Sequence, residues 1–200
     1  LGCGVFTGAG AVMNTADIEA GSSVVVFGAG GVGLSAVQGA RLRSASDIIS
    51  VDIVPEKLDI ATEIGATHTI DSSEEDTVDR IEEITDGGAD YSFEIVGSSH
   101  VAEQAVDCLA PAGQTVLVGV PPAGKQDIAV DLYDMVVSEK EIIGSFNGSY
   151  SLPRAIPRLA DLVAKGDLRL DPLISDRRPL TELNEAMHTL EAGTGIRQII

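Results

Sequence analysis

Short apolar runs alternate with amphipathic stretches from residue 24 to about residue 147. The apolar runs are residues 24–27, 48–51, 67–70, 89–96, 115–120 and 141–146. Between them, apolar residues recur at helical spacing, as in Val32, Ala36 and Ala40. This alternation of strands and helices predicts an α/β fold: a doubly wound parallel sheet of about six strands, covered by helices on both faces.

The helices between these strands have recognisable ends. We expect them at residues 31–44, 55–64, 77–85 and about 99–109. Pro111 and Gly113 should stop the last of these helices. Beyond residue 148 the alternation ends, and residues 154–165 and 182–193 are predicted to form two helices, with a short strand near residues 196–200. We therefore expect a sheet domain over residues 21–147 and part of a second domain over residues 148–200.

A glycine-rich turn joins the first predicted strand to the first helix, with the sequence Gly28-Ala29-Gly30-Gly31-Val32-Gly33. In a turn of this kind the first glycine permits a tight bend, the second leaves room for a pyrophosphate and the third lets the helix pack on the strand. Free backbone N–H groups at the helix N-terminus favour phosphate. The turn therefore predicts a dinucleotide site.

A carboxylate supports this interpretation. Asp52 ends the second predicted strand, 19 residues after Gly33, where it would accept hydrogen bonds from an adenosine ribose. An acid there would repel a 2′-phosphate, so NAD is favoured over NADP. Lys57 lies near enough in the sequence to weaken that preference.

The charge balance excludes some partners. The chain carries 31 acidic and 13 basic residues, a formal net charge of −18, so it should bind neither nucleic acid nor anionic membranes. The acids are scattered along the chain and lysine is rare, which favours a protein adapted to concentrated salt, in a halophilic cytoplasm. No apolar stretch approaches the ~20 residues of a membrane span.

The two cysteines, Cys3 and Cys108, lie far apart in the sequence, which favours a reducing compartment, the cytoplasm, over a disulfide scaffold. Cys108 is expected to be buried and inert. Glu94, near the end of the fourth predicted strand, is expected to be structural. Leu1-Gly2-Cys3-Gly4 has no basic leader pattern, and we expect the chain to come from the middle of a longer protein.

Several segments, taken in order, resemble the zinc-dependent alcohol dehydrogenases of the medium-chain dehydrogenase/reductase group. They are Gly2-Cys3-Gly4, Thr7-Gly8, the glycine turn, Val51-Asp52-Ile53, Gly65-Ala66-Thr67, Asp86-Gly87-Gly88-Ala89-Asp90, Phe93-Glu94, Val118-Gly119-Val120-Pro121, Asp171-Pro172-Leu173-Ile174, Asn184-Glu185-Ala186 and Gly195-Ile196-Arg197. The glutathione-dependent formaldehyde dehydrogenases and aryl-alcohol dehydrogenases are nearest. The resemblance implies reversible hydride transfer between an alcohol and an aldehyde or ketone, with NAD and a catalytic zinc.

The resemblance also implies a division of the chain. Residues 1–20 would be the end of a catalytic domain and a linking helix, residues 21–147 the NAD-binding domain, and residues 148–200 a C-terminal, largely helical part of the catalytic domain. Most of the N-terminal catalytic domain would precede residue 1. Family members form homodimers or homotetramers, and the apolar residues 141–146 suggest an edge strand able to pair with a second copy.

The family's site residues transfer to particular positions here. The resemblance implies that Thr7 lies against the nicotinamide and acts in catalysis. Besides the turn residues Gly28, Gly30, Gly31, Val32 and Gly33, it implies cofactor contacts from Asp52, Lys57, Val96, Val118, Val120, Ser145, Phe146 and Arg197. Cys3 matches one thiolate ligand of the catalytic zinc, whose other ligands would lie upstream of this chain.

Three alternatives remain. The chain could be an NAD-binding module without catalytic activity, a zinc-free relative similar to the quinone reductases, or a methyltransferase. Gly33 and the ending Gly195-Ile196-Arg197 argue against the methyltransferase. Cys3 favours the zinc branch over the quinone reductases.

Overall fold

A parallel sheet of six strands forms the body of the protein, in the order β3-β2-β1-β4-β5-β6. This computed structural model describes residues 1–16, 18–124, 127–193 and 195–200. The strands are β1 (Ser23–Phe27), β2 (Asp47–Asp52), β3 (His68–Asp71), β4 (Ala89–Glu94), β5 (Leu109–Leu117) and β6 (Glu141–Gly144). The order reverses direction between β1 and β4, so the crevice where ligands bind in such sheets lies above these two strands.

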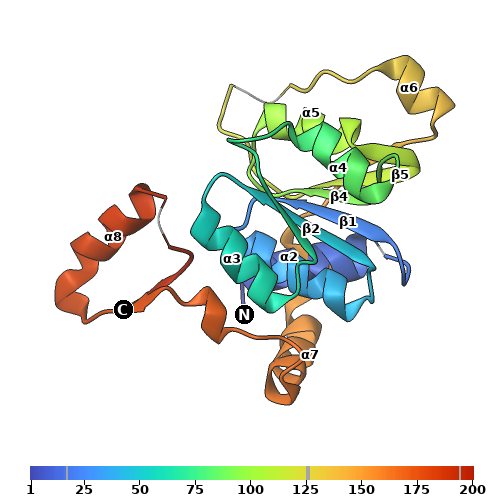
Figure 1. Ribbon diagram of the computed structural model, residues 1–200. Helices are drawn as coiled ribbons and strands as arrows, with labels where there is room; N and C mark the ends of the chain where they lie inside the picture. Colours follow the sequence, from blue (N-terminus) through green and yellow to red (C-terminus); the bar gives the residue numbers. More distant parts are fainter. Residues whose placement is uncertain (17, 125–126, 194) are drawn as a thin grey trace.

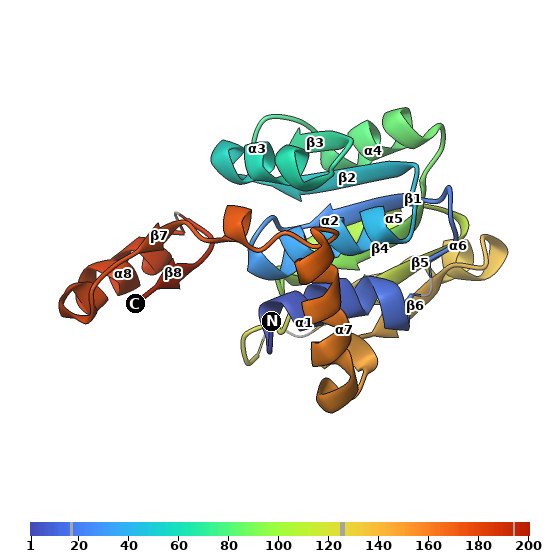
Figure 2. The same cartoon turned by 90° about the horizontal axis from the view of Figure 1, so that it is seen from below.

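Helices cover both faces of the sheet (Figure 1). The helices of the described residues are α1 (Gly4–Gly10), α2 (Gly31–Leu42), α3 (Pro55–Ile64), α4 (Thr77–Thr85), α5 (Ser99–Asp107), α6 (Leu132–Val137), α7 (Leu152–Lys165) and α8 (Leu183–Glu191), of which α6 and α8 do not cover the sheet (Figure 2). A π-helical turn, η1 (Ala11–Thr15), continues α1, and 3₁₀ turns form η2 (Asn147–Ser149), η3 (Asp171–Leu173) and η4 (Leu180–Glu182). Among the described residues, no helix is both long and apolar enough to cross a bilayer.

Burial on both faces explains why the first strand reads as an unbroken apolar run. Val24 and Val26 pack into the cluster under α1, α2 and α3, whereas Val25 and Phe27 pack into the cluster under α4 and α5. Successive side chains of a strand point to opposite faces, so a strand covered twice must be apolar at every position. The doubly wound fold expected from the sequence is confirmed.

The fifth strand begins earlier than predicted. The sequence placed Leu109 at the end of a helix and the strand at residues 115–120, but β5 starts at Leu109 itself. The pairing register between β4 and β5 shifts over the first residues, and Ala112 has a positive φ of 63°. Pro111 and Gly113 therefore lie in an irregular strand start and do not end a helix there.

The strands also end sooner than predicted. β4 ends at Glu94, β5 at Leu117 and β6 at Gly144, so Val96, Val118 and Val120, like Ser145 and Phe146, lie in the loops that follow.

α6 was not predicted. It has no buried residue, because its apolar side chains face away from the rest of the described protein.

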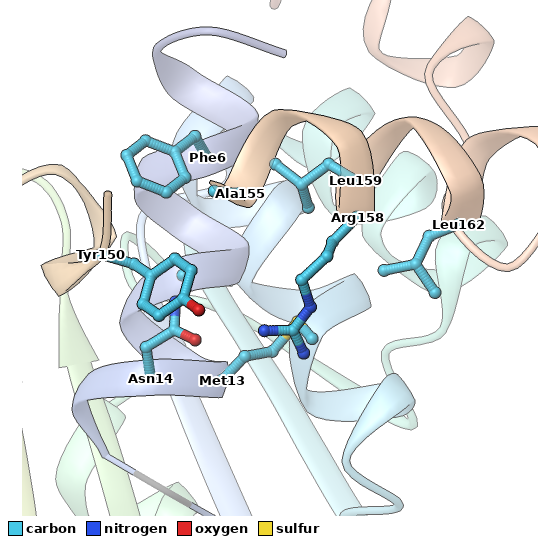
Figure 3. Close-up of a pocket in the computed structure, with 9 residues that line it drawn as sticks. Phe6, Met13, Asn14, Tyr150, Ala155, Arg158, Leu159 and Leu162 are labelled. Carbon is cyan, nitrogen blue, oxygen red and sulfur yellow. The ribbon is translucent and has the colours of Figure 1, made fainter. Parts of the chain in front are cut away.

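The first part of the C-terminal segment packs on the sheet body. Figure 3 shows Leu159 and Leu162 of α7 facing α1 and η1 across a small cavity, about 30 Å³, which Phe6 and Met13 also line. The Arg158 guanidinium lies 5.9 Å from the centre of the Tyr150 ring. From about residue 175 the chain projects from the body with α8 and a two-stranded sheet of β7 (Asp176–Arg177) and β8 (Gln198–Ile199), as Figure 2 shows.

Candidate functional site

Three glycines of the turn between β1 and α2 meet three different constraints. Gly28 has a φ of 99°, a conformation that side chains rarely adopt. Gly30 is the N-cap of α2, and a Cβ built there meets nothing within 4 Å. A Cβ on Gly33 would lie 1.7 Å from the carbonyl oxygen of Gly28. The first glycine is therefore required by backbone shape and the third by packing, and the second leaves space open.

That open space is a cavity of about 250 Å³ at the N-terminus of α2. Its lining comprises Gly28, Gly30, Gly31, Val32, Gly33, Asp52, Ile95 and Val96. Gly30 supplies no side chain to cap the helix, so the amides of the first turn are available to an anion. The five glycine-turn positions predicted to bind a cofactor all line this one cavity.

A second cavity of about 510 Å³ adjoins the first and shares Gly28, Asp52 and Val96 with it. It is lined by Phe27, Gly28, Val51, Asp52, Ile53, Val54, Lys57, Ser72, Val96, Ser98, Val101, Gln104, Ala192 and Gly193. The volume is in the range of small-molecule sites, and the mixture of apolar walls with few polar groups is typical of them.

Asp52 stands at the junction of the two cavities. Its Oδ2 accepts a hydrogen bond from the backbone N–H of Ala29 at 2.7 Å. Its Oδ1 accepts the N–H groups of Ile53 at 2.9 Å and Val54 at 3.0 Å. The carboxylate is thus held at the mouth of the crevice by backbone groups from two loops and lines both cavities. Its role toward a ribose stays a prediction.

Arg197 lies close to the glycine turn. A Cβ built on Gly31 would be 3.8 Å from its Nη2, and one built on Gly4 would be 3.2 Å away. The guanidinium therefore stands beside the first turn of α2, although 164 residues of sequence separate Arg197 from Gly33. It also lines a third cavity, about 260 Å³, with Leu1, Gly2, Cys3, Gly4, Val5, Leu170, Leu173, Ile174 and Ile199.

Cys3 is exposed and carries a free thiol at that third cavity. Within residues 1–16, 18–124, 127–193 and 195–200, no three His, Cys, Asp or Glu side chains gather where they could hold a metal ion. A catalytic zinc site needs about three protein ligands, so the described residues do not fit a complete zinc site.

Five other predicted residues line neither of the two adjoining cavities. The Ser145 hydroxyl lies 2.8 Å from that of Thr15, Phe146 and Val120 are exposed, and Val118 packs against the core. Thr7 lies partly buried in α1. Their roles toward a nicotinamide stay predictions.

The structure adds cavity residues that the sequence interpretation missed. Ile53, Val54, Ser72, Ser98, Val101 and Gln104 line the larger cavity. Ser72 directly follows β3. A polar residue just past the carboxyl end of a predicted strand could have been recognised as a candidate cavity residue. Val101 and Gln104 belong to α5, where the helical pattern alone does not distinguish a cavity wall from a solvent face.

Cys108 is buried, as predicted, and Glu94 is buried too. Burial raises the pKa of the Cys108 thiol to about 12, which keeps it protonated and unreactive at neutral pH. Glu94 accepts the backbone N–H of Gly97 at 2.7 Å, a contact consistent with a structural carboxylate.

Comparison with known proteins gives consistent results. The family model described as zinc-binding dehydrogenase matches residues 31–165. The chain is 40% identical to alcohol dehydrogenase-like 7 of Arabidopsis thaliana over 204 residues, covering all of this chain and 52% of that protein. Thus it spans about half the length of the curated relatives it matches.

Solved structures agree. Benzyl alcohol dehydrogenase from Acinetobacter calcoaceticus superimposes with a TM-score of 0.94 at 39% identity, over 98% of this chain and 54% of that one. A putative zinc-binding dehydrogenase from Sinorhizobium meliloti, bound to NADP, gives 0.85 at 30% identity, over 98% and 56%.

Proposed function

Because the chain belongs to the zinc-binding dehydrogenase family, among the medium-chain alcohol dehydrogenases, we propose that it is the NAD-binding half of an enzyme that oxidises alcohols or reduces aldehydes and ketones. Its single strongest support is the pair of adjoining cavities over β1 and β4, with Asp52 at their junction. NAD, when bound, would accept or donate the hydride.

The residues divide the binding work. The first-turn amides of α2 receive the pyrophosphate in the cavity that Gly30 leaves open. Arg197, beside Gly31, donates to the same phosphates from the opposite side. Asp52 and Lys57 bind the adenosine ribose in the larger cavity, and the apolar side chains there cover the adenine.

Asp52 favours NAD over NADP. Its carboxylate is fixed by three backbone N–H groups, so it cannot swing away from a 2′-phosphate without losing them. The repulsion of two negative charges at close range in a half-buried site disfavours the phosphorylated ribose. Because the Sinorhizobium relative is bound to NADP, we base this preference on Asp52 of this chain and not on the family.

We propose Cys3 as this chain's contribution to a catalytic zinc in the whole protein. The other ligands would then lie outside the described residues, and we derive no step through the metal. The 260 Å³ cavity beside Cys3 would form one wall of the site for the alcohol or aldehyde.

A non-catalytic NAD-binding module is the second candidate. The observation that favours it is the solitary position of Cys3 among the described residues. A zinc-free reductase similar to the quinone reductases is a further alternative. In such an enzyme the exposed thiol of Cys3 would have no metal to bind. In each case we propose a cytoplasmic homodimer or homotetramer with a small-molecule substrate and no nucleic-acid or membrane partner.

Isothermal titration of the chain with NAD⁺, NADP⁺ and S-adenosylmethionine tests the proposal. We expect NAD⁺ to bind best, NADP⁺ at least about tenfold more weakly, and S-adenosylmethionine not measurably. Equal or tighter binding of NADP⁺ would remove the role assigned to Asp52. Preference for S-adenosylmethionine would overturn the dehydrogenase proposal.

A further inference from the structure

Glu94 is a buried carboxylate at the C-terminal end of β4, and only 3% of its surface is exposed. Its Oε1 accepts the N–H of Gly97 at 2.7 Å and that of Ser98 at 3.4 Å. Burial raises the pKa of the Glu94 carboxyl, and backbone N–H groups of the two adjacent loops offset part of that rise. A buried carboxylate is tolerated only where such donors surround it.

Two loops meet around this carboxylate without space for side chains. Gly97, with a φ of 80°, follows β4, and a Cβ there would lie 2.6 Å from the carbonyl oxygen of Val120. A Cβ on Gly119, which follows β5, would lie 2.1 Å from the nitrogen of Gly97 and 2.6 Å from Oε2 of Glu94. The Glu94 side chain therefore fixes how the loops after β4 and β5 pack on each other.

The loop after β4 also forms part of the nucleotide site. Val96 lies between Glu94 and Gly97 in the sequence, and its Cγ2 is 3.0 Å from a Cβ built on Gly28. Val96 lines both adjoining cavities, and Ser98 lines the larger one. The position of this shared wall thus depends on the backbone that Glu94 holds.

We propose that Glu94 is a positioning residue for the nucleotide site: its carboxylate holds residues 95–98 so that Val96 stands against Gly28 and divides the two cavities. This inference rests on the proposed binding of NAD. Glu94 touches no ligand in this account. It acts through the N–H groups of Gly97 and Ser98.

Few ionisable groups surround Glu94 among the described residues. The effect of its carboxyl on NAD⁺ affinity can therefore be followed through the pH dependence of binding. It lines a small cavity, about 70 Å³, with Gly97, Ser98, Ser99, Ala102, Leu117, Gly119, Pro121 and Ile128. Of these described lining residues, Glu94 alone carries an acid or a base. The larger nucleotide cavity is lined by Asp52 and Lys57, which are present in the wild type and in every Glu94 variant alike.

The test compares the wild type with Glu94→Gln by titration with NAD⁺ between pH 8 and pH 5.5. A glutamine of the same shape offers one acceptor and one donor, and the donor opposes the loop N–H groups. We expect about tenfold weaker binding at pH 8. The ratio of the two dissociation constants should fall as the pH approaches the raised pKa of the Glu94 carboxyl, because a protonated carboxyl, like the glutamine amide, presents one donor and one acceptor to the loop N–H groups.

Ser92→Ala is the matched control, since Ser92 is a buried polar residue on the same strand whose hydroxyl bonds to Ala105 and Thr115, away from the loop. It should lower the melting temperature and leave NAD⁺ affinity unchanged. Glu94→Asp keeps the charge and should recover part of the affinity lost in Glu94→Gln. If Glu94→Gln does not fold, Glu94→Asp alone must still bind NAD⁺ more weakly than the wild type.

Equal affinities of the wild type and the Glu94 variants would overturn the inference. A ratio that rises as the pH is lowered would also overturn it, because protonation should remove the advantage of the wild type. An equal loss of affinity in Ser92→Ala would do so too, because it indicates a general effect on stability. A wild type that binds no NAD⁺ overturns the proposed function and this inference together, whereas failure in the variants alone overturns only the inference.

Discussion

The carboxylate of Asp52 and the backbone N–H of Ala29 are joined by a hydrogen bond of 2.7 Å. This bond ties the tip of β2 to the glycine turn after β1, so the group that we propose to select the ribose also supports the loop that we propose to receive the phosphates. We therefore expect nucleotide binding and local stability to be coupled at this side chain.

Asp52→Asn tests both proposed roles of Asp52, in nucleotide binding and in the stability of the glycine turn. We expect about tenfold weaker NAD⁺ binding and a smaller preference for NAD⁺ over NADP⁺, because the repulsion of a 2′-phosphate is removed. An asparagine has one acceptor oxygen where the carboxylate uses two to accept the N–H groups of Ala29, Ile53 and Val54, so stability should fall by about 1 kcal/mol. Titration with both nucleotides and thermal melting check this. An unchanged preference would contradict the selecting role.

Arg197 is exposed and its guanidinium stands beside Gly31, next to the proposed pyrophosphate site. Arg197→Ala should weaken NAD⁺ binding about tenfold, the typical effect of losing a charge-assisted hydrogen bond, with little change in melting temperature. Arg177→Ala, on the same projecting segment and also exposed, is the control and should bind as the wild type does. Equal affinities in all three proteins would exclude Arg197 from the site.

The edge of the sheet predicts self-association. β6 pairs with β5 and stands at the end of the strand order, while Tyr133 and Val136 of α6 are 76% and 75% exposed. We expect a dimer that pairs β6 with its twin and covers α6. Tyr133→Asp combined with Val136→Asp should produce monomers in light scattering after gel filtration.

Met187→Asp, on the exposed side of α8, is the matched control for that experiment and should leave the dimer intact. A wild type that elutes as a monomer would contradict the assembly.

The acidic surface predicts salt dependence. At 1 M salt the screening length is about 3 Å, so the mutual repulsion within a chain of net charge −18 is largely removed. The melting temperature should therefore rise by several degrees between 0.1 M and 2 M KCl. Sucrose, which does not screen charge, should give a smaller rise at equal osmolality. A melting temperature that falls with KCl would contradict salt adaptation.

The glycine turn and Asp52 could be predicted from the sequence because their constraints are local. A tight bend, an open helix N-terminus and an acid at a strand tip each leave a mark within about 25 residues. The doubly wound fold followed from periodicity for the same reason.

Features that depend on contacts between segments far apart in the sequence were either not predicted or predicted at the wrong residues. The early start of β5 depends on its pairing with β4, and the walls formed by Gln104 and Gly193 depend on where α5 and the end of α8 lie. Glu94 was expected to be structural. Its contacts with the loop that carries Val96 depend on the close approach of Gly97 and Gly119. These two glycines lie on different loops, so no local sequence pattern predicts that approach.

The central claim is that the space above Gly30 receives phosphate, and the affinity of Gly30→Ala for NAD⁺ tests it most directly. A methyl group there meets nothing in the protein, so this variant should melt like the wild type. Gly33→Ala, whose Cβ would lie 1.7 Å from the Gly28 oxygen, should instead lose about 3 kcal/mol or more of stability. The account predicts that Gly30→Ala is fully folded and binds NAD⁺ at least about tenfold more weakly. Wild-type affinity in folded Gly30→Ala would contradict it.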